Sequence, residues 1–326
     1  MARICVAGGA GFIGSHLVAY LKSIGHWVRA VDIQRPQWGW IAEPDQYWQF
    51  DLRRFDHCIL AVESCDQVYN LAADMGGIGY IHAKHAQIAF NNAMISNYML
   101  EAARRMHVQR FLFTSSACIY PLHLQTSADV APLKESDAYP AMPEDAYGWE
   151  KLVTERTGRH YYEDYGMEFR CARFHNIYGP ETCYDGGKEK APAALCRKIA
   201  RAKLLGQDEI EMWGDGKQTR SFCYVDDCTF LLHRLMESGH RDPINIGTDR
   251  LISINELAYL IARIADIDIK INHVQGTQGV RGRNADLTIM RKVLGCTRVS
   301  LEDGLAKTYA WIEERVKEDL NAAAAK

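Results

Sequence analysis

The pair Tyr147 and Lys151 is the first feature of this sequence that could do chemistry. The two residues are four apart at the start of a helical stretch, so they share one face of the helix. An ordinary phenol, with a pKa of about 10, is a poor base at neutral pH and needs a neighbouring ammonium to favour its phenolate. Lys151 can supply that ammonium, and Ser116 can hold a substrate hydroxyl while Tyr147 removes its proton. A Tyr-x-x-x-Lys spacing alone is often only a solvated helix face.

A glycine loop near the N-terminus would bind the hydride acceptor that such an oxidation needs. The apolar run Arg3 to Ala7 is followed by Gly-Gly-Ala-Gly-Phe-Ile-Gly and then by a helical pattern. We expect a strand, a tight turn and a helix whose N-terminus attracts a pyrophosphate. The residues expected to contact a dinucleotide here are Gly8, Gly11, Phe12, Ile13 and Gly14. The spacing is G-x-x-G-x-x-G and not G-x-G-x-x-G, and a glycine loop alone could be a mere sharp turn.

Three later strands are expected to end beside the same loop. The strand Trp27 to Val31 ends in Asp32, about 20 residues past the loop, where a carboxylate can accept hydrogen bonds from both ribose hydroxyls. A carboxylate would repel a 2′-phosphate, so we predict NAD. Because Arg35 could bind a 2′-phosphate, NADP remains the alternative cofactor. The next two strands bring further residues to the crevice, namely Asp51, Leu52, Leu71, Ala72 and Ala73. The Ala72-Ala73 pair could equally be small residues that pack against a helix.

The elements that must position these residues alternate between strand and helix. A long helical pattern from about Ala86 to Met106 is followed by the strand Arg110 to Thr114. This alternation predicts an α/β protein with a doubly wound parallel sheet of the Rossmann type. We expect a domain over residues 1–178 that binds NAD and carries the catalytic serine, tyrosine and lysine. Residues 179–326 should form a smaller α/β domain for the substrate, with an approximate boundary and an interleaved chain. The last helix is expected from Leu301 to about Leu320, with a frayed tail beyond it.

Composition excludes several classes of protein. The 326 residues, 48% hydrophobic and 24% charged, are typical of a soluble globular chain and not of a disordered one. A net charge of -3 makes nucleic acid a poor default partner. The ten cysteines include no C-x-x-C pair, so we expect reduced thiols in a cytosolic compartment and no metal site. Glycines interrupt the N-terminal apolar run, and no run approaches the roughly 18 residues of a membrane span, so we predict neither a signal peptide nor a membrane anchor.

Four strings of sequence narrow the prediction. They are Ala-Asp-Met-Gly-Gly-Ile-Gly-Tyr at 73–80, Ser-Ser-Ala-Cys-Ile-Tyr-Pro at 115–121, Arg-Phe-His-Asn-Ile-Tyr-Gly-Pro at 173–180 and Gly-Gly-Lys-Glu-Lys-Ala-Pro at 186–192. With the glycine loop and the Tyr/Lys pair, the chain resembles the extended short-chain dehydrogenase/reductase superfamily over nearly its whole length. Within that superfamily, the four strings together resemble the branch of the GDP-mannose 3,5-epimerases. The resembling chains more often show an acidic residue soon after Pro121, where this one has Leu122-His123, and this puts the shape of that loop in doubt.

The resemblance implies epimerisation of GDP-mannose at C3 and C5, to GDP-L-galactose or GDP-L-gulose. Once C4 has been oxidised to a ketone, the C–H bonds at C3 and C5 lie α to a carbonyl, and a nearby thiolate can take a proton to give an enolate. By resemblance Cys118 is that base, and Lys190 is the acid on the opposite face, with Lys188 as the fallback. Without the motifs, Cys118 would be interpreted as a small buried hydrophobe and Lys190 as a solvated loop charge.

The same resemblance implies contacts with the sugar nucleotide. The residues concerned are Met75, Gly76, Ser116, Ala117, Cys118, Asn176, Glu189, Lys190, Ala191, Lys198, Gln218, Arg220 and Arg281. Arg220, Lys198 and Arg281 would contact the diphosphate and nucleotide, because charge-assisted hydrogen bonds suit phosphate. Asn176 would bind the sugar or diphosphate, although His175-Asn176 could equally be a structural turn.

Two other functions stay open. A nucleotide-sugar 4-epimerase or 4,6-dehydratase needs Tyr147, Lys151 and the cofactor but no Cys/Lys pair, and the lack of Asp-Glu after Ser116 argues against dehydration. A non-catalytic NAD-sensing protein would keep the fold alone. Members of the superfamily often form homodimers through a four-helix interface, which here would use the helices at 86–106 and 147–165, but those faces could simply be core.

Overall fold

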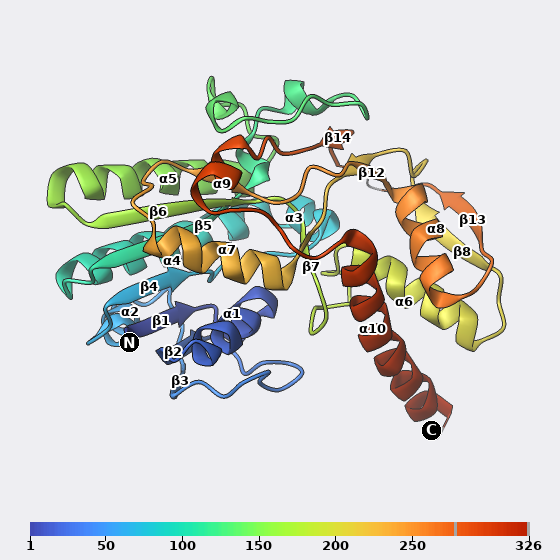
Figure 1. Ribbon diagram of the computed structural model, residues 1–326, viewed down its shortest axis with the longest axis horizontal. Coiled ribbons are helices and arrows are strands. Elements are labelled where there is room, and N and C mark those ends of the chain that lie inside the picture. The colour runs from blue at the N-terminus through green and yellow to red at the C-terminus, as the bar shows by residue number, and fades with distance from the viewer. Residues whose placement is uncertain (277–278, 325–326) are drawn as a thin grey trace.

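A seven-stranded parallel sheet forms the larger part of the molecule (Figure 1). The computed structural model describes residues 1–276 and 279–324. In spatial order the strands are β11 (Ile244–Ile246), β6 (Glu168–Phe174), β5 (Arg110–Ser116), β4 (Gln67–Asn70), β1 (Arg3–Ala7), β2 (Trp27–Asp32) and β3 (Gln46–Gln49). Every neighbouring pair is parallel, and the chain order reverses at β1. The predicted doubly wound sheet is confirmed, and such sheets bind ligands at the carboxyl ends of the strands beside the reversal.

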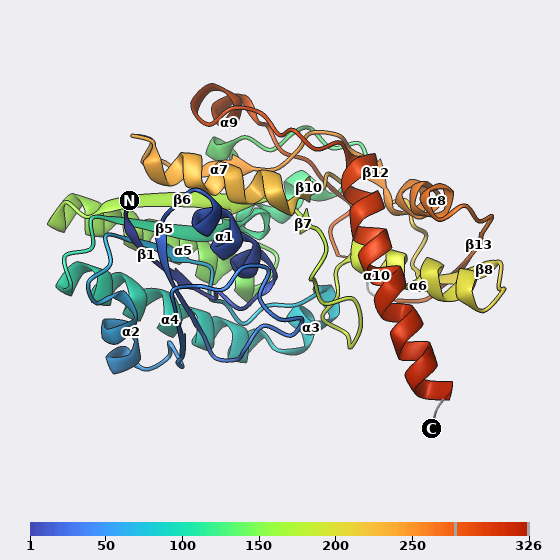
Figure 2. The same ribbon diagram turned by 60° about the horizontal axis from the view of Figure 1, so that its bottom comes forward.

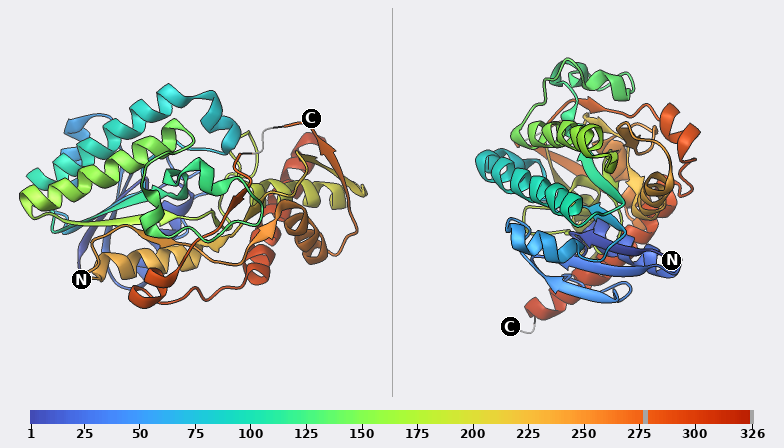
Figure 3. Two further views of the ribbon diagram at one scale, coloured as in Figure 1. Left: turned by 90° about the horizontal axis from the view of Figure 1, so that it is seen from above. Right: turned by 90° about the vertical axis from the view of Figure 1, so that its left-hand side faces the viewer.

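Helices cover both faces of the sheet (Figure 3). On one side α2 (Phe55–Val62), α4 (His85–Arg105) and α5 (Ala146–Tyr165) pack in a row, and on the other side α1 (Phe12–Ser23) packs against α7 (Val225–Glu237). Because both faces are covered, the central strands are buried almost without interruption, as in the run Ile4 to Ala7 of β1, whereas the edge strand β3 has no buried residue.

A smaller lobe lies beyond the carboxyl ends of the strands (Figure 2). Its helices α6 (Ala191–Leu204), α8 (Ile254–Ala265) and α10 (Leu301–Ala324) pack on one another, and β8 (Glu209–Trp213) pairs with β13 (Lys270–Val274). The remaining short elements are β7 (Ile177–Tyr178), β9 (Thr219–Arg220), β10 (Cys223–Tyr224), β12 (Ile252–Ser253), β14 (Gly282–Arg283), α3 (Ile78–Ala83) and α9 (Thr288–Val293). Helix α8 begins with a capping box, in which the Ser253 hydroxyl accepts a hydrogen bond from the Glu256 amide.

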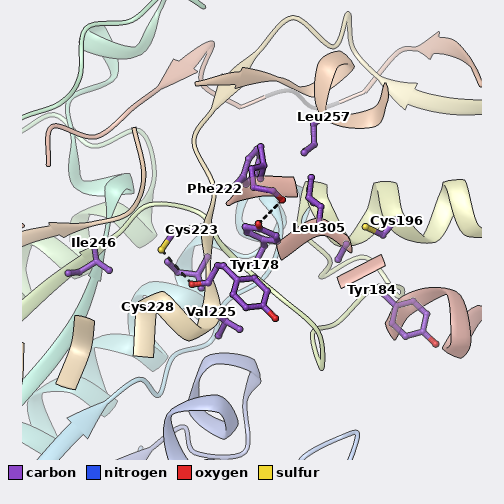
Figure 4. Close-up of a cluster of buried hydrophobic side chains, with 14 of the residues drawn as sticks. Tyr178, Tyr184, Cys196, Phe222, Cys223, Val225, Cys228, Ile246, Leu257 and Leu305 are labelled. Carbon is purple, nitrogen blue, oxygen red and sulfur yellow. Dashed lines mark hydrogen bonds between the residues drawn. The ribbon is translucent and has the colours of Figure 1, made fainter. Parts of the chain in front are cut away.

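The two lobes share one hydrophobic core. After Tyr178 the chain enters the smaller lobe, returns to the sheet for α7 and β11, and leaves again for α8. Figure 4 shows Tyr178 and Phe222 near Leu305 from α10, with Cys223 and Cys228 on the other side of Tyr178, all within a continuous cluster that reaches from α1 to α8. The shared core fixes the lobes relative to each other, so residues from both can build one site.

Two elements differ from the sequence prediction. The segment before the long helix forms a separate short helix, α3, because Lys84 leaves helical geometry (φ -139°, ψ 37°) before α4 begins. The prediction of a frayed tail after Leu320 is wrong through Ala324, where α10 continues over alanines of high helix propensity. Among residues 1–276 and 279–324, no helix is both long enough and apolar enough to cross a membrane.

Candidate active site

The glycine loop lies at the reversal of the sheet, against the end of β4. Gly8 has φ +77°, and a Cβ there would lie 2.8 Å from the backbone nitrogen of Ala72, so only glycine allows this approach. A Cβ on Gly14 would collide with the Gly8 carbonyl. Helix α1 begins after Gly11 with no side-chain cap and no acidic residue in its first turn. Its first amides, from Phe12 and Ile13 onward, are therefore free to bind a pyrophosphate.

The carboxylate of Asp32 lies beside this loop. It accepts hydrogen bonds from the amides of Ala10 (3.1 Å) and Gln34 (3.3 Å). Burial raises the pKa of Asp32, and these backbone bonds oppose the rise. Arg35, which would favour a 2′-phosphate, lies over the ring of Tyr47, 5.6 Å from its centroid. The arrangement fits a ribose with free hydroxyls.

The other residues predicted to bind the cofactor lie at the ends of β3 and β4. The Asp51 carboxylate pairs with Arg53 (2.7 Å), which lowers the pKa of Asp51, and Leu52 is buried. The Leu71 amide donates to the Ala7 carbonyl (2.9 Å), so the chain continues beside β1 past the end of β4. Ala72 and Ala73, partly exposed, follow at the same edge as Gly8. Their contact with a cofactor stays a prediction.

The structure brings Ser116, Tyr147 and Lys151 together. The carboxylate of Asp145 caps α5 by accepting the Gly148 amide (2.8 Å), and a Cβ on Gly148 would collide with the Cys118 carbonyl. This close contact holds the start of α5 against the end of β5.

In this position the Ser116 side chain acts to lower the pKa of Tyr147, and the Lys151 ammonium lies 5.4 Å from the centre of the Tyr147 ring. Burial raises the pKa of Tyr147 well above its usual value. The phenolate therefore depends on positive charge placed beside it.

Cys118 lies next to this set and faces two arginines. Nη1 of Arg283 lies 3.4 Å from Sγ of Cys118, and its Nε donates to Gln125 at 2.5 Å. Arg283 in β14 is paired with Arg220 in β9. Burial and the charge of Arg283 lower the pKa of Arg220 to about 9, while Cys118 opposes the shift. Two guanidiniums thus converge near the thiol.

Arg281, predicted from the sequence to contact the diphosphate and nucleotide, has a carboxylate partner within the protein. The Arg281 guanidinium forms a bidentate ion pair with Asp215 (2.8 Å for each contact), and it is Arg283 that reaches Cys118. Sequence reasoning missed Arg283 because the two arginines are two residues apart in an extended segment, where alternation gives both the same side. Only the pairing of β14 with β9 shows which one lies beside the thiol.

Lys190 belongs to a loop that packs on the Met-Gly-Gly segment. The Gly77 amide donates to the Lys188 carbonyl (3.1 Å), and a Cβ on Gly77 would lie 2.7 Å from the Glu189 carbonyl oxygen. The Lys188 ammonium lies over the ring of Tyr80, 4.5 Å from its centroid.

Lys190 itself is at the N-cap of α6, next to Ala191 and exposed to solvent, yet protein surrounds it closely enough that burial lowers its pKa. The thiols of Cys118 and Cys228 oppose that shift. The charge of Cys118 therefore acts on Lys190, while the Lys188 ammonium is engaged with the Tyr80 ring.

Several other predicted substrate residues have polar partners within the protein. The side-chain amide of Asn176 donates to the Ser221 carbonyl (2.9 Å), and Asn176 has φ +39° next to the fully buried His175. The Lys198 ammonium donates to the Glu211 carbonyl (2.7 Å). Met75 and Gly76 lie in the loop after β4, while Ala117 and Gln218 are buried. Their contacts with a substrate stay predictions. Among the described residues no cluster of histidine, cysteine and carboxylate side chains could hold a metal ion.

Comparison with known proteins places this geometry in a family. Residues 4–247 match the NAD dependent epimerase/dehydratase family. The chain is 48% identical to GDP-mannose 3,5-epimerase 1 of Oryza sativa subsp. indica over 321 residues, which are 97% of this chain and 83% of that protein. Among solved structures it is similar to UDP-glucose 4-epimerase of Thermotoga maritima with UDP-glucose (TM-score 0.86, 27% identity, 96% and 99% of the chains). It is also similar to UDP-glucuronic acid 4-epimerase of Bacillus cereus with UDP-glucuronic acid and NAD (TM-score 0.79, 25%, 96% and 99%).

Proposed function

The chain belongs to the NAD-dependent epimerase/dehydratase family, and we propose that it epimerises GDP-mannose at C3 and C5 to GDP-L-galactose, with GDP-L-gulose as the product of inversion at C5 alone. The observation that carries the proposal is the place of Cys118 beside the redox residues: its carbonyl abuts Gly148, the residue after Tyr147, and its Sγ lies 3.4 Å from Nη1 of Arg283. The charge of Cys118 also acts on both Tyr147 and Lys190. A 4-epimerase needs the tyrosine but has no use for a thiol and an ammonium beside it.

The residues around the glycine loop fit NAD. The free first turn of α1 would hold the pyrophosphate and Asp32 the adenosine ribose. NAD held there would supply the hydride acceptor for oxidation at C4 and the hydride donor for the final reduction, so the reaction would have no net redox change. Tyr147 takes the C4 hydroxyl proton as the hydride leaves, while Ser116 holds that hydroxyl and Lys151 stabilises the phenolate.

The oxidised sugar makes the second chemistry possible. The C4 ketone acidifies the C–H bonds at C5 and C3, and the Cys118 thiolate removes a proton from each to leave an enolate. Lys190 returns a proton to the opposite face, which inverts the centre. Before the second inversion the Cys118 thiol loses its proton to solvent, and the solvent-exposed Lys190 amine regains one. The guanidinium of Arg283 stabilises negative charge on Sγ. Reduction at C4, with the proton returned from Tyr147, then releases the product.

We also propose a homodimer formed through α4 and α5. These helices lie side by side on the outside of the sheet (Figure 3), and they leave Phe90 (64% exposed), Trp149 (46%) and Val153 (59%) at the surface. A second copy of the same face would cover this apolar surface. A reducing, cytosolic compartment is the location we propose, and what supports it is that all ten cysteines are free thiols.

Product analysis tests the proposed function. Purified protein is incubated with GDP-mannose, and the sugar nucleotides are separated and identified by NMR. The proposal predicts the 3,5- and 5-epimers with no loss of water. A 4-keto-6-deoxy sugar would identify a dehydratase, and inversion at C4 a 4-epimerase. Binding of NAD without any change in a panel of nucleotide sugars would favour a sensing protein.

A further inference from the structure

A buried carboxylate that the proposed mechanism does not use lies beside the redox pair. Glu150 precedes Lys151 on α5, and its side chain is 4% exposed. Its Oε1 lies 3.5 Å from the Lys151 ammonium and accepts a hydrogen bond from Nδ2 of Asn92 at 3.0 Å. Within the described part of the chain, no polar group reaches its other oxygen, Oε2, which is also buried.

This arrangement is costly for stability. A buried ion pair repays its desolvation only when the remaining lone pairs are satisfied, and an apolar residue of similar volume is often at least as stable. Glu150 does not meet this requirement, because Oε2 is unpaired, and its contact with Lys151 is also longer than a good hydrogen bond. A buried, poorly satisfied carboxylate next to catalytic groups points to a functional role.

The charged and titratable groups around Glu150 define what it can do. On its own helix these are Lys151 and Tyr147, and at the N-cap of that helix Asp145. In the described part of α4, the neutral amide of Asn92 is the polar group that contacts Glu150, and Asn92 in turn binds the backbone of Asp74. Burial raises the pKa of Glu150, while Lys151 and Asn92 oppose the rise by stabilising the carboxylate.

We propose that Glu150 is a positioning residue that, as a carboxylate, offsets part of the Lys151 charge and so keeps the C4 proton on Tyr147 while C5 and C3 are inverted. The inference rests on the proposed function. Oxidation moves a hydride from C4 to the cofactor and a proton from the C4 hydroxyl to the Tyr147 phenolate. A more basic Tyr147 phenolate shifts this equilibrium toward the ketone and the protonated tyrosine. Two successive inversions need a longer-lived ketone than one does.

The effect of Glu150 on Tyr147 has the required sign. The charge of Glu150 contributes to the raised pKa of Tyr147, after burial and Cys118. Removing that charge leaves Lys151 uncompensated, so the phenolate becomes less basic. One pKa unit corresponds to about a tenfold change in the ratio of ketone to alcohol.

The test measures how the affinities for NAD+ and NADH depend on pH, without any sugar. NAD+ places a positive charge beside Tyr147 and NADH does not, so the NAD+ affinity rises above the pH at which Tyr147 ionises in the complex, and the NADH affinity serves as the reference. The rise should be absent in Tyr147→Phe, which would assign it to ionisation of Tyr147. In Glu150→Gln, which keeps the volume and the bond from Asn92, we expect the rise to begin at lower pH by about one unit. Glu150→Asp keeps the charge and should stay close to the wild type.

A control and a second readout complete the test. Glu163→Gln changes an exposed glutamate at the other end of α5 and should leave the onset unchanged. Glu150→Met is matched in volume and should shift the onset as Gln does, even if the Gln variant folds poorly. With GDP-mannose, Glu150→Gln should raise the share of the 5-epimer severalfold. If the NAD+ affinity began to rise at the same pH in Glu150→Gln, in Glu150→Met and in the wild type, the inference would be overturned. Failure of the wild type to convert GDP-mannose would instead contradict the proposed function.

Discussion

Nη1 of Arg283 lies 3.4 Å from Sγ of Cys118, so that a residue near the end of the chain reaches the turn that follows β5. The contact joins the smaller lobe to the sheet at the point where the proposed carbon acid chemistry takes place. Arg281, two residues earlier, is paired with Asp215 instead. Substituting each arginine in turn therefore tests the contact with Cys118, with Arg281 as the matched control.

Arg283→Met should slow epimerisation far more than Arg281→Met. Losing one charge-assisted hydrogen bond, worth about 1.5–3 kcal/mol, corresponds to a fall in kcat of roughly tenfold to a hundredfold. The rate at which iodoacetamide alkylates Cys118, followed by mass spectrometry of its peptide, should fall in the Arg283 variant alone. Equal alkylation rates in the two variants would show that Arg283 does not stabilise the thiolate.

Gly77→Ala should displace the loop that carries Lys190. Its new Cβ would lie 2.7 Å from the Glu189 carbonyl oxygen, whereas at Gly79, the matched control, a Cβ would have nothing within 4 Å. A misplacement of about 1 Å can cost up to a hundredfold in rate, so we expect a tenfold to hundredfold loss of kcat in Gly77→Ala. Gly79→Ala should keep normal activity. Similar kcat values for both variants would mean that contact with Gly77 does not position Lys190.

The ion pairs of His16 should stabilise the protein at acidic and neutral pH but not at alkaline pH. Its ring contacts Glu181 (3.0 Å) and Asp226 (3.7 Å), joining α1 to the loop after β7 and to α7. Burial alone would lower the pKa of His16, but these carboxylates outweigh it and raise the pKa to about 9. The stabilisation is therefore complete below the unfolded pKa of about 6.5 and is lost as pH rises through about 9.

Urea unfolding of wild type and His16→Gln measures this term. We expect the variant to lose on the order of 2 kcal/mol at pH 6 and almost nothing at pH 10. A difference that is the same at both pH values would show that His16 acts through packing, for instance against Phe12, and not through its charge.

Val153→Arg should separate the proposed homodimer. The substitution places a charge on the exposed apolar face of α4 and α5. Sedimentation should show a dimer for the wild type and a monomer for the variant. Tyr259→Arg, at a residue that is 50% exposed on α8, is the control and should stay dimeric. A wild type that sediments as a monomer would refute the proposal.

The sequence predicted the elements around the glycine loop well, because hydrophobic periodicity and glycine positions are local signals. The strand before Asp32 and the helix that carries Tyr147 and Lys151 lie where the pattern put them. Helix α3 was missed because its start packs on a distant segment, where the amide of its N-cap Gly77 donates to the Lys188 carbonyl, 111 residues away in the chain.

The sequence predicted only those site residues that lie within a recognisable motif. Lys190 was favoured over Lys188 by resemblance, and its role as the acid stays a prediction. In the structure the Lys188 ammonium lies over the ring of Tyr80. Arg283 could not be distinguished from Arg281, because strand pairing between β14 and β9 leaves no trace in local spacing. The unsatisfied oxygen of Glu150 is likewise a property of packing and not of sequence.

The most direct test of the account is position-resolved deuterium uptake by GDP-mannose in heavy water, for the wild type and for Cys118→Ala. The account predicts deuterium at C3 and C5 of the wild-type product and none at C4, because the C4 hydride is returned within the site. Cys118→Ala should remain folded and bind NAD but introduce no deuterium. Label at C3 and C5 in the Cys118→Ala product, or label at C6 with loss of water in the wild type, would contradict it.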